Sequence, residues 1–212
     1  MGDSPLREPE REEEYLAEEA DASETKKMSG KAKRRFWETE LLRLILYLLV
    51  LFTVTILFIR FVMQRTDVSG NSMLPMLEDG DSLLVDKISY RFRDPDRFDI
   101  VVFPFTQSEE TFFIKRVIGL PGETVQITED GRIWINGEHL EEHYGLEVIK
   151  DPGRAVTPVV LGEDEYFVLG DNRNNSLDSR RIEVGNIHAD QIIGRAWIRL
   201  FPFSNFGFIK HQ

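Results

Sequence analysis

The chain has 212 residues, enough for one domain of ordinary size with appendages, and its formal net charge is −11. It contains no cysteine, which excludes disulfides, a cysteine nucleophile and thiolate metal sites. The charge is uneven: residues 1–24 carry −8, residues 25–63 carry +6 and residues 64–212 carry −9. Because the last and longest region is acidic, we do not expect it to bind nucleic acid.

Residues 1–35 are predicted to be a disordered tail on the cytoplasmic side of a membrane. The run from Glu8 to Glu19 has many charges and few apolar residues, so it buries too little surface to offset the entropy of ordering. A basic cluster follows, made of Lys26, Lys27, Lys31, Lys33, Arg34 and Arg35. A nucleic-acid patch is the generic alternative, but positive charge beside an apolar segment marks the cytoplasmic side.

Residues 36–63 are predicted to form a single transmembrane anchor helix. From Leu41 to Met63 the chain is mostly Leu, Ile, Val and Phe, and about 20 apolar residues suffice to span a bilayer. Arg43 and Arg60 lie near the two ends, where long side chains reach the headgroups. A cleaved signal peptide is the alternative, yet the apolar run is too long and no small-residue cleavage site follows it. We therefore expect residues 64–212 on the outer side.

The region after the anchor is predicted to be mainly β. Short runs of β-forming residues bounded by turn residues predict strands; these runs are 82–85, 99–103, 111–114, 132–135, 165–169 and 196–200. Asp130-Gly131 and Asn136-Gly137 are hairpin signals. We expect a compact antiparallel β domain with coiled, barrel-like sheets, and a small excursion from its core near residues 139–160.

Four phenylalanines stand two or three residues apart near the end of the sequence: Phe201, Phe203, Phe206 and Phe208. This spacing is consistent with an apolar surface that rests on the outer face of a membrane. Burial as a cap on the β core is the equal alternative, because aromatic side chains are commonly buried.

A lysine near the middle of the chain is a candidate catalytic base. Serine proteolysis requires a nucleophile, a base that takes its proton, and donors for the oxyanion. No histidine lies in a block that resembles a Ser-His-Asp triad, and no Gly-x-Ser-x-Gly elbow occurs. Lysine has an ordinary pKa of about 10.4 and needs burial to become neutral. Lys115 follows the apolar run Thr111–Ile114, which favours burial, although an exposed head group is the ordinary alternative.

One motif points to a different chemistry. The stretch His139-Leu140-Glu141-Glu142-His143 matches His-x-x-Glu-His, a zinc-protease signature. That motif requires a helix, where its two histidines share a face. Here it begins two residues after a hairpin signal, so we interpret it as polar residues on an exposed hairpin and expect no metal site.

Three blocks that follow the anchor resemble the type I signal peptidases, membrane-bound serine proteases that use a lysine base. The blocks are Ser69–Met76 (SGNSMLPM), Phe113–Glu123 (FIKRVIGLPGE) and Gly170–Arg180 (GDNRNNSLDSR). The resemblance implies that Ser72 is the nucleophile and Lys115 the general base, and that Ser176 orients the lysine amine. It covers the chain from the anchor to about Arg199.

The resemblance also implies residues that support catalysis and bind substrate. The implied supporting ion pairs involve Arg116, Asp171, Asp178 and Arg180. Shallow pockets for small substrate residues at −1 and −3 are implied at Val68, Met73, Leu77, Leu83, Phe113 and Ile114. Ordinary core packing is the alternative, most of all for Leu77 and Leu83.

The oxyanion hole departs from the family pattern. It is implied at Ser72 and Gly70, where the Ser72 backbone N–H is one donor. Some members carry a serine hydroxyl at the position of Gly70, so another group or a water must take its part here. The first block also ends Pro75-Met76 where Pro-Thr is usual, and Phe113 stands where Tyr is frequent.

The function implied by the resemblance is the endoproteolytic removal of N-terminal signal peptides from exported preproteins at a bacterial cytoplasmic membrane. The implied partners are signal peptides, the lipid bilayer and the protein-export translocon, with no metal or organic cofactor. Two alternatives are a specialised Ser/Lys processing peptidase of the same family and an inactive membrane-tethered module that binds signal peptides. The presence of Ser72, Lys115 and Ser176 favours an active enzyme.

Overall fold

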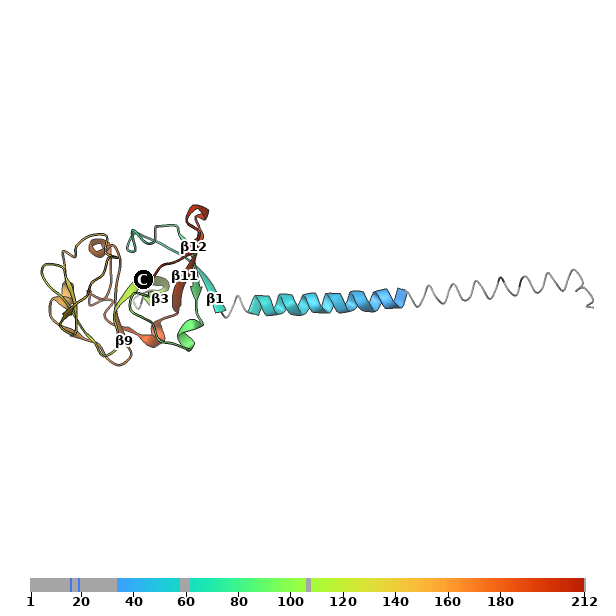
Figure 1. Ribbon diagram of the computed structural model, residues 1–212, viewed down its shortest axis with the longest axis horizontal. Coiled ribbons are helices and arrows are strands. Elements are labelled where there is room, and N and C mark those ends of the chain that lie inside the picture. Colours follow the sequence, from blue (N-terminus) through green and yellow to red (C-terminus); the bar gives the residue numbers. More distant parts are fainter. Residues whose placement is uncertain (1–15, 17–18, 20–33, 58–61, 106–107, 212) are drawn as a thin grey trace, which may run out of the picture. The chain divides into compact units, whose positions relative to one another are not determined.

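The computed structural model describes residues 16, 19, 34–57, 62–105 and 108–211 (Figure 1). The chain divides into two compact units, Met1–Ile56 and Leu57–Gln212. Most of the predicted tail, residues 1–35, lies outside the described residues, so its disorder stays a prediction.

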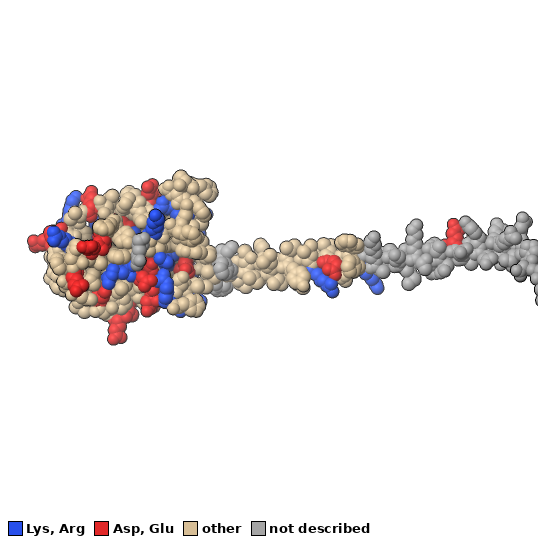
Figure 2. Space-filling model, in the orientation of Figure 1, with Lys and Arg blue, Asp and Glu red and all other residues tan. Residues whose placement is uncertain are grey.

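The helix Arg34–Leu57 makes up most of the described part of the first unit, and its last residue is counted with the second. It is long and apolar enough to cross a membrane by length and composition. Its leucines, isoleucines and valines are exposed, and Figure 2 shows charged side chains on it only toward its N-terminal end. The hydroxyls of Thr53 and Thr55 donate to carbonyls four residues earlier, each at 2.8 Å. Satisfying polar groups within the helix is what a hydrocarbon environment requires.

The C-terminal end of the predicted anchor differs from the expectation. Residues 58–61 lie outside the described residues, and Met63 is already the first residue of strand β1, Met63–Asp67. Met63 pairs with Asp86 on the neighbouring strand. This pairing explains why an apolar residue that continues the apolar run belongs to the sheet.

The second unit contains a main antiparallel sheet with the order β1-β2-β11-β3-β4-β9-β10, and β12 pairs with β11. Besides β1, its strands are β2 Ser82–Asp86, β3 Ile100–Phe105, β4 Ser108–Gly119, β9 Glu165–Leu169, β10 Ile187–His188, β11 Gly194–Phe201 and β12 Gly207–Phe208. The mainly β, antiparallel prediction is confirmed. Among the described strands the end strands β1 and β10 do not pair with each other, so a barrel-like closure is not confirmed.

A second antiparallel sheet has the order β7-β6-β5-β8. Its strands are β5 Thr124–Ile127, β6 Ile133–Ile135, β7 Glu138–His139 and β8 Val159–Val160. Asn136 and Gly137 have φ values of 53° and 83° and form the β6–β7 turn, as predicted from the Asn-Gly pair. The expected excursion near residues 139–160 is therefore the latter part of a sheet that begins at Thr124.

Short 3-10 helices connect these strands in the second unit. They are η1 Ser89–Arg91, η2 Gly153–Val156, η3 Arg173–Asn175, η4 Ala189–Gln191 and η5 Phe203–Asn205. Of these, η3 lies within the third sequence block and so belongs to the candidate site.

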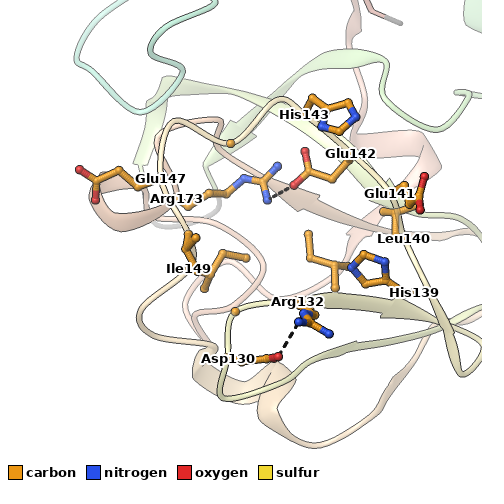
Figure 3. A pocket seen from close by; sticks show the side chains of 14 residues that line it. Asp130, Arg132, His139, Leu140, Glu141, Glu142, His143, Glu147, Ile149 and Arg173 are labelled. Carbon is orange, nitrogen blue, oxygen red and sulfur yellow. Dashed lines mark hydrogen bonds and ion pairs between the residues drawn. The ribbon is translucent and has the colours of Figure 1, made fainter.

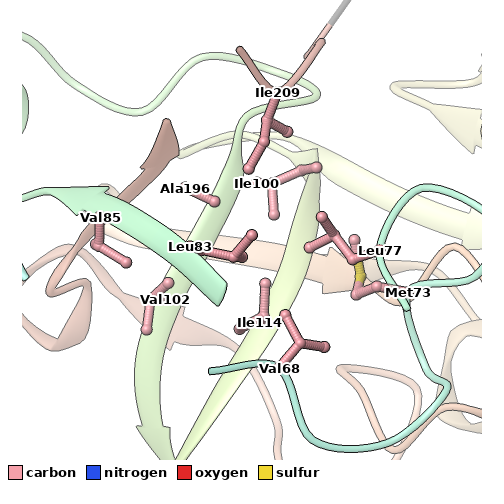
Figure 4. Close-up of a cluster of buried hydrophobic side chains, with 10 residues drawn as sticks. All are labelled: Val68, Met73, Leu77, Leu83, Val85, Ile100, Val102, Ile114, Ala196 and Ile209. Carbon is pink, nitrogen blue, oxygen red and sulfur yellow. The ribbon is translucent and has the colours of Figure 1, made fainter. Parts of the chain in front are cut away.

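One cluster of buried side chains supports the first sequence block (Figure 4). Alternation along the strands points Leu83 of β2, Ile100 of β3 and Ile114 of β4 into this cluster. Met73 of the block and Leu77, which directly follows the block, pack there as well and are 1% and 0% exposed. Burying such a side chain stabilises the fold by roughly 1.5–3 kcal/mol. The segment that carries Ser72 is therefore held in place by packing against this buried cluster.

Candidate active site

Ser72 lies in a turn between β1 and β2. Gly70 has φ +91°, a left-handed conformation that favours glycine, and its N–H donates to Asp79 Oδ1 at 2.7 Å. Because that amide hydrogen is engaged, Gly70 is not a free donor for an oxyanion. The described part of the chain offers the Ser72 N–H no hydrogen-bond acceptor.

Lys115 lies on β4 opposite this turn and is 4% exposed. Its Nζ is 2.7 Å from Ser72 Oγ and 3.0 Å from the Ile114 carbonyl oxygen. The ring centre of Phe113, two residues earlier on the same strand, is 4.9 Å from Nζ. The structure thus brings the two predicted catalytic residues into hydrogen-bond contact, although they are 43 positions apart.

The surroundings of Lys115 favour its neutral form. Burial lowers the pKa of Lys115 from 10.5 to about 8, and the negative charges of Asp178 and Asp171 oppose this shift only in part. A substantial fraction of the amine is therefore unprotonated at mildly alkaline pH. Only that form has a lone pair that accepts a proton from a serine.

Ser176 lies close to the Ser72 turn. A Cβ on Gly170 would overlap both Ser176 Oγ and the Ser72 carbonyl oxygen, so Gly170 allows these groups to meet. Ser176 Oγ is buried and has no hydrogen-bond partner within the described residues. The structure gives no hydrogen bond between Ser176 and Lys115, so the orienting role of Ser176 remains a prediction.

The four charged residues predicted to support the site form two separate buried pairs. Arg116 donates to Asp171 through Nε at 2.8 Å and Nη2 at 2.6 Å. Arg180 donates to Asp178 through Nε at 2.8 Å and Nη2 at 2.9 Å. Paired donation of this kind fixes orientation as well as distance. The first pair ties the third block to β4 beside Lys115.

A cleft of about 450 Å³ opens beside Ser72 and Lys115. Four of the six predicted pocket residues line it: Val68, Met73, Phe113 and Ile114. Leu77 and Leu83 do not line it; both are fully buried core residues, as the alternative interpretation had it. Sequence reasoning missed other lining residues, which are Thr66, Asp67, Ser69, Thr111, Phe112 and Leu177. Of these, Leu177 could have been predicted from the sequence, because it directly follows Ser176 in the third block.

A larger cavity of about 680 Å³ lies beside the second sheet and is lined in part by the His-x-x-Glu-His stretch (Figure 3). His139 is in strand β7 and His143 is in irregular structure, so no helix aligns them. Figure 3 shows their rings lying apart, and Glu142 pairs with Arg173 at 2.7 Å. The described residues include no group of three or more His, Cys, Asp or Glu that suits a metal ion.

The geometry at Ser72 and Lys115 has a clear chemical capability. A serine hydroxyl in contact with a buried amine of lowered pKa, beside an open cleft, supplies the nucleophile and the base that a serine hydrolase with a lysine base requires. Among the described residues, no histidine forms a hydrogen bond with Ser72 or Lys115.

Comparison with known proteins agrees with this class. The family model for "Signal peptidase, peptidase S26" matches residues 39–201. A signal peptidase I of Leptolyngbya laminosa is 46% identical over 154 residues, covering 69% of this chain and 73% of the relative. A probable signal peptidase I-2 of Synechocystis sp. is 40% identical over 154 residues, covering 70% and 68%. A signal peptidase I of Bacillus caldolyticus is 38% identical over 160 residues, covering 70% and 85%. This chain belongs to the signal peptidase family, peptidase S26.

Proposed function

We propose that this chain is a membrane-anchored Ser/Lys endopeptidase that removes N-terminal signal peptides from exported preproteins. The observation that carries the proposal is the 2.7 Å contact between Ser72 Oγ and the buried Nζ of Lys115. Membership of the signal peptidase family supplies the substrate class.

The proposed reaction uses two steps. In the first, neutral Lys115 takes the Ser72 proton as Oγ attacks the scissile carbonyl carbon, and the resulting ammonium then protonates the leaving amine. This leaves an acyl ester on Ser72 and a neutral Lys115. In the second step Lys115 takes a proton from water, the hydroxide adds to the ester, and the proton returns to Ser72 Oγ as the signal peptide leaves.

The oxyanion of each step needs donors in a fixed direction. The Ser72 N–H is our candidate, because the described residues leave it without an acceptor. The Gly70 amide is engaged by Asp79 at 2.7 Å, so a second donor must come from another group or a water.

Substrate is proposed to bind as an extended peptide along β4. Residues Phe112 to Lys115 pair with β3 on one side, whereas pairing with β9 begins at Arg116. The other edge of this stretch lies beside the cleft and suits an added strand. Val68 and Met73 line the cleft and are 6% and 1% exposed, and the proposed pockets for small side chains at −1 and −3 lie against them.

The apolar helix Arg34–Leu57 is proposed to anchor the chain in a bacterial cytoplasmic membrane. Basic residues precede the helix, and positive charge marks the cytoplasmic side, so the N-terminus is placed there and the catalytic unit outside. Nearness to the export translocon follows from this location as part of the proposal.

Residues 1–24 are expected to be dispensable for catalysis. They carry −8 and lie on the opposite side of the membrane from Ser72 in the proposed topology. A truncation that starts near Lys26 keeps the basic cluster and so preserves insertion. We expect preprotein cleavage within about twofold of the full chain, measured on membranes with equal amounts of inserted protein. Much slower cleavage by the inserted truncation would remove this expectation.

The C-terminal phenylalanines are proposed to contact lipid. They do not cap the core: Phe201, Phe203, Phe206 and Phe208 are 52%, 82%, 63% and 72% exposed. Changing all four to Ser in residues 62–212 expressed alone is expected to abolish sedimentation with anionic vesicles and to leave the melting temperature nearly unchanged, because little core contact is lost. Retained vesicle binding, or unfolding of the variant, would count against the membrane role.

Cleavage of a preprotein by the full chain purified in detergent tests the proposed function. Mass spectrometry of the products is expected to show one cut after a small residue at −1, with another small residue at −3. Cleavage restricted to a few unusual precursors would indicate the specialised peptidase. Binding of signal peptides without any cleavage would indicate the inactive tethered module.

A further inference from the structure

A short loop at the start of the third block touches both catalytic segments. Its residue Asp171 accepts two hydrogen bonds from Arg116, which follows Lys115 on β4. The next residue, Asn172, contacts the turn that carries Ser72. Two consecutive residues therefore connect the strand of the base to the turn of the nucleophile.

Asn172 makes two hydrogen bonds to that turn. Its backbone N–H donates to the Ser72 carbonyl oxygen at 3.0 Å. Its side-chain Nδ2 donates to the Asn71 carbonyl oxygen, also at 3.0 Å. These carbonyls belong to the peptide units on either side of the Ser72 Cα, so one residue holds both units.

Holding these two units sets two directions at once. A peptide unit is planar and trans, so its N–H points opposite to its carbonyl. The Asn71 carbonyl and the Ser72 N–H belong to the same unit, and fixing one therefore fixes the other. With both units held, the Cα–Cβ bond of Ser72 is also oriented. Rotation about that bond then decides whether Oγ meets Lys115, and the hydrogen bond to Nζ selects the rotamer that does.

The close approach of the two segments depends on Gly170. A side chain there would overlap the Ser72 carbonyl oxygen and Ser176 Oγ. The Gly170 N–H is held by Asp178 Oδ2 at 3.1 Å, and Asp178 is paired with Arg180. The loop that presents Asn172 is thus braced by buried ion pairs on both sides.

We propose that Asn172 is a positioning residue, which aims both the Ser72 hydroxyl at Lys115 and the Ser72 N–H at the oxyanion. It touches no reacting atom and acts through the backbone of residues 71 and 72. The inference rests on the proposed peptidase function and adds a residue to its machinery.

The test alters only the hydrogen bond that the Asn172 side chain donates to the Asn71 carbonyl oxygen. Asn172→Ala removes the donor, and Asn172→Asp keeps the shape but places a carboxylate oxygen against the Asn71 carbonyl. Asn175→Ala is the matched control, because Asn175 is exposed in the same loop and its backbone N–H bond to the Asn172 carbonyl is kept. The full chain in detergent is assayed for kcat, KM and their pH dependence, and hydrogen exchange is followed over residues 69–74.

We expect Asn172→Ala to lower kcat by roughly 10- to 100-fold, because small misplacement of a nucleophile is costly. Asn172→Asp is expected to lower it further. KM is expected to change by less than about twofold, since the cleft walls are intact. The midpoint of the pH profile near 8 is expected to stay, because Lys115 remains buried. Exchange over residues 69–74 is expected to accelerate, and Asn175→Ala to behave like the unaltered chain.

Three results would overturn the inference. One is a kcat for Asn172→Ala within about threefold of the unaltered chain, with unchanged exchange. Another is a raised KM at constant kcat, which would make Asn172 a substrate contact. The third is a loss of activity in Asn172→Ala that is no larger than the loss of folded protein measured by thermal melting. If the unaltered chain cleaves nothing, the proposed function fails, and the exchange measurement alone then decides the inference.

Discussion

Ser72→Ala is expected to lower kcat for preprotein cleavage by roughly a thousandfold or more, because it removes the nucleophile. The fold is expected to survive this change. Ser72 lies in a turn, and loss of one partly exposed hydroxyl changes the free energy of unfolding by less than about 1 kcal/mol. Cleavage rate and thermal melting are measured on the same preparation.

Ser204→Ala is the control for that change, because Ser204 is an exposed serine of η5 and does not line the cleft beside Ser72. It is expected to cleave like the unaltered chain. A folded Ser72→Ala variant that still cleaves at a comparable rate would exclude Ser72 as the nucleophile.

Lys115→Arg and Lys115→Met are both expected to abolish cleavage. Arginine keeps the positive charge, but its guanidinium does not lose a proton in the working range of pH. Methionine keeps an apolar stem and has no basic group. The matched control is Lys150→Arg, at an exposed lysine that pairs with Glu147, and it is expected to be fully active. Substantial cleavage by Lys115→Arg would mean that Lys115 supplies charge rather than accepting a proton.

Lys115→Met is also expected to stabilise the fold at neutral pH. The pKa of Lys115 is lower in the folded chain, about 8 against 10.5. Burial of the protonated Lys115 amine therefore lowers the free energy of unfolding by its full amount below about pH 8, and this loss of stability disappears as pH rises toward 10.5. The shift corresponds to about 3 kcal/mol, an upper estimate because the contact with Ser72 is lost as well. Denaturant unfolding at pH 7 and at pH 10 measures this difference, which is expected to shrink at the higher pH.

Strands with strong patterns were predictable from sequence, whereas polar and very short strands were not. Runs of apolar β-formers marked β2 and β9 closely. Strand β1, Met63–Asp67, is mostly polar and becomes a strand through pairing with β2, which no local pattern records. Strand β8 has two residues and depends on β5 in the same way.

The site shows a similar division. The three blocks named Ser72 and Lys115, but spacing along the chain did not imply their 2.7 Å contact. Asn172 escaped notice because asparagine is an ordinary turn residue, and its importance lies in which carbonyls it meets. Leu77 and Leu83 were expected in the pockets by resemblance, yet both belong to the core beneath them.

The pH dependence of kcat/KM for one preprotein tests the Ser72–Lys115 mechanism most directly. We expect the rate to rise with pH between about 6 and about 10. The rise should follow a single ionisation near pH 8, where buried Lys115 loses its proton, and level off above it. Lys115→Arg should remain at background throughout. A rate already maximal at about pH 6, or a profile that Lys115→Arg reproduces, would contradict a neutral lysine as the base.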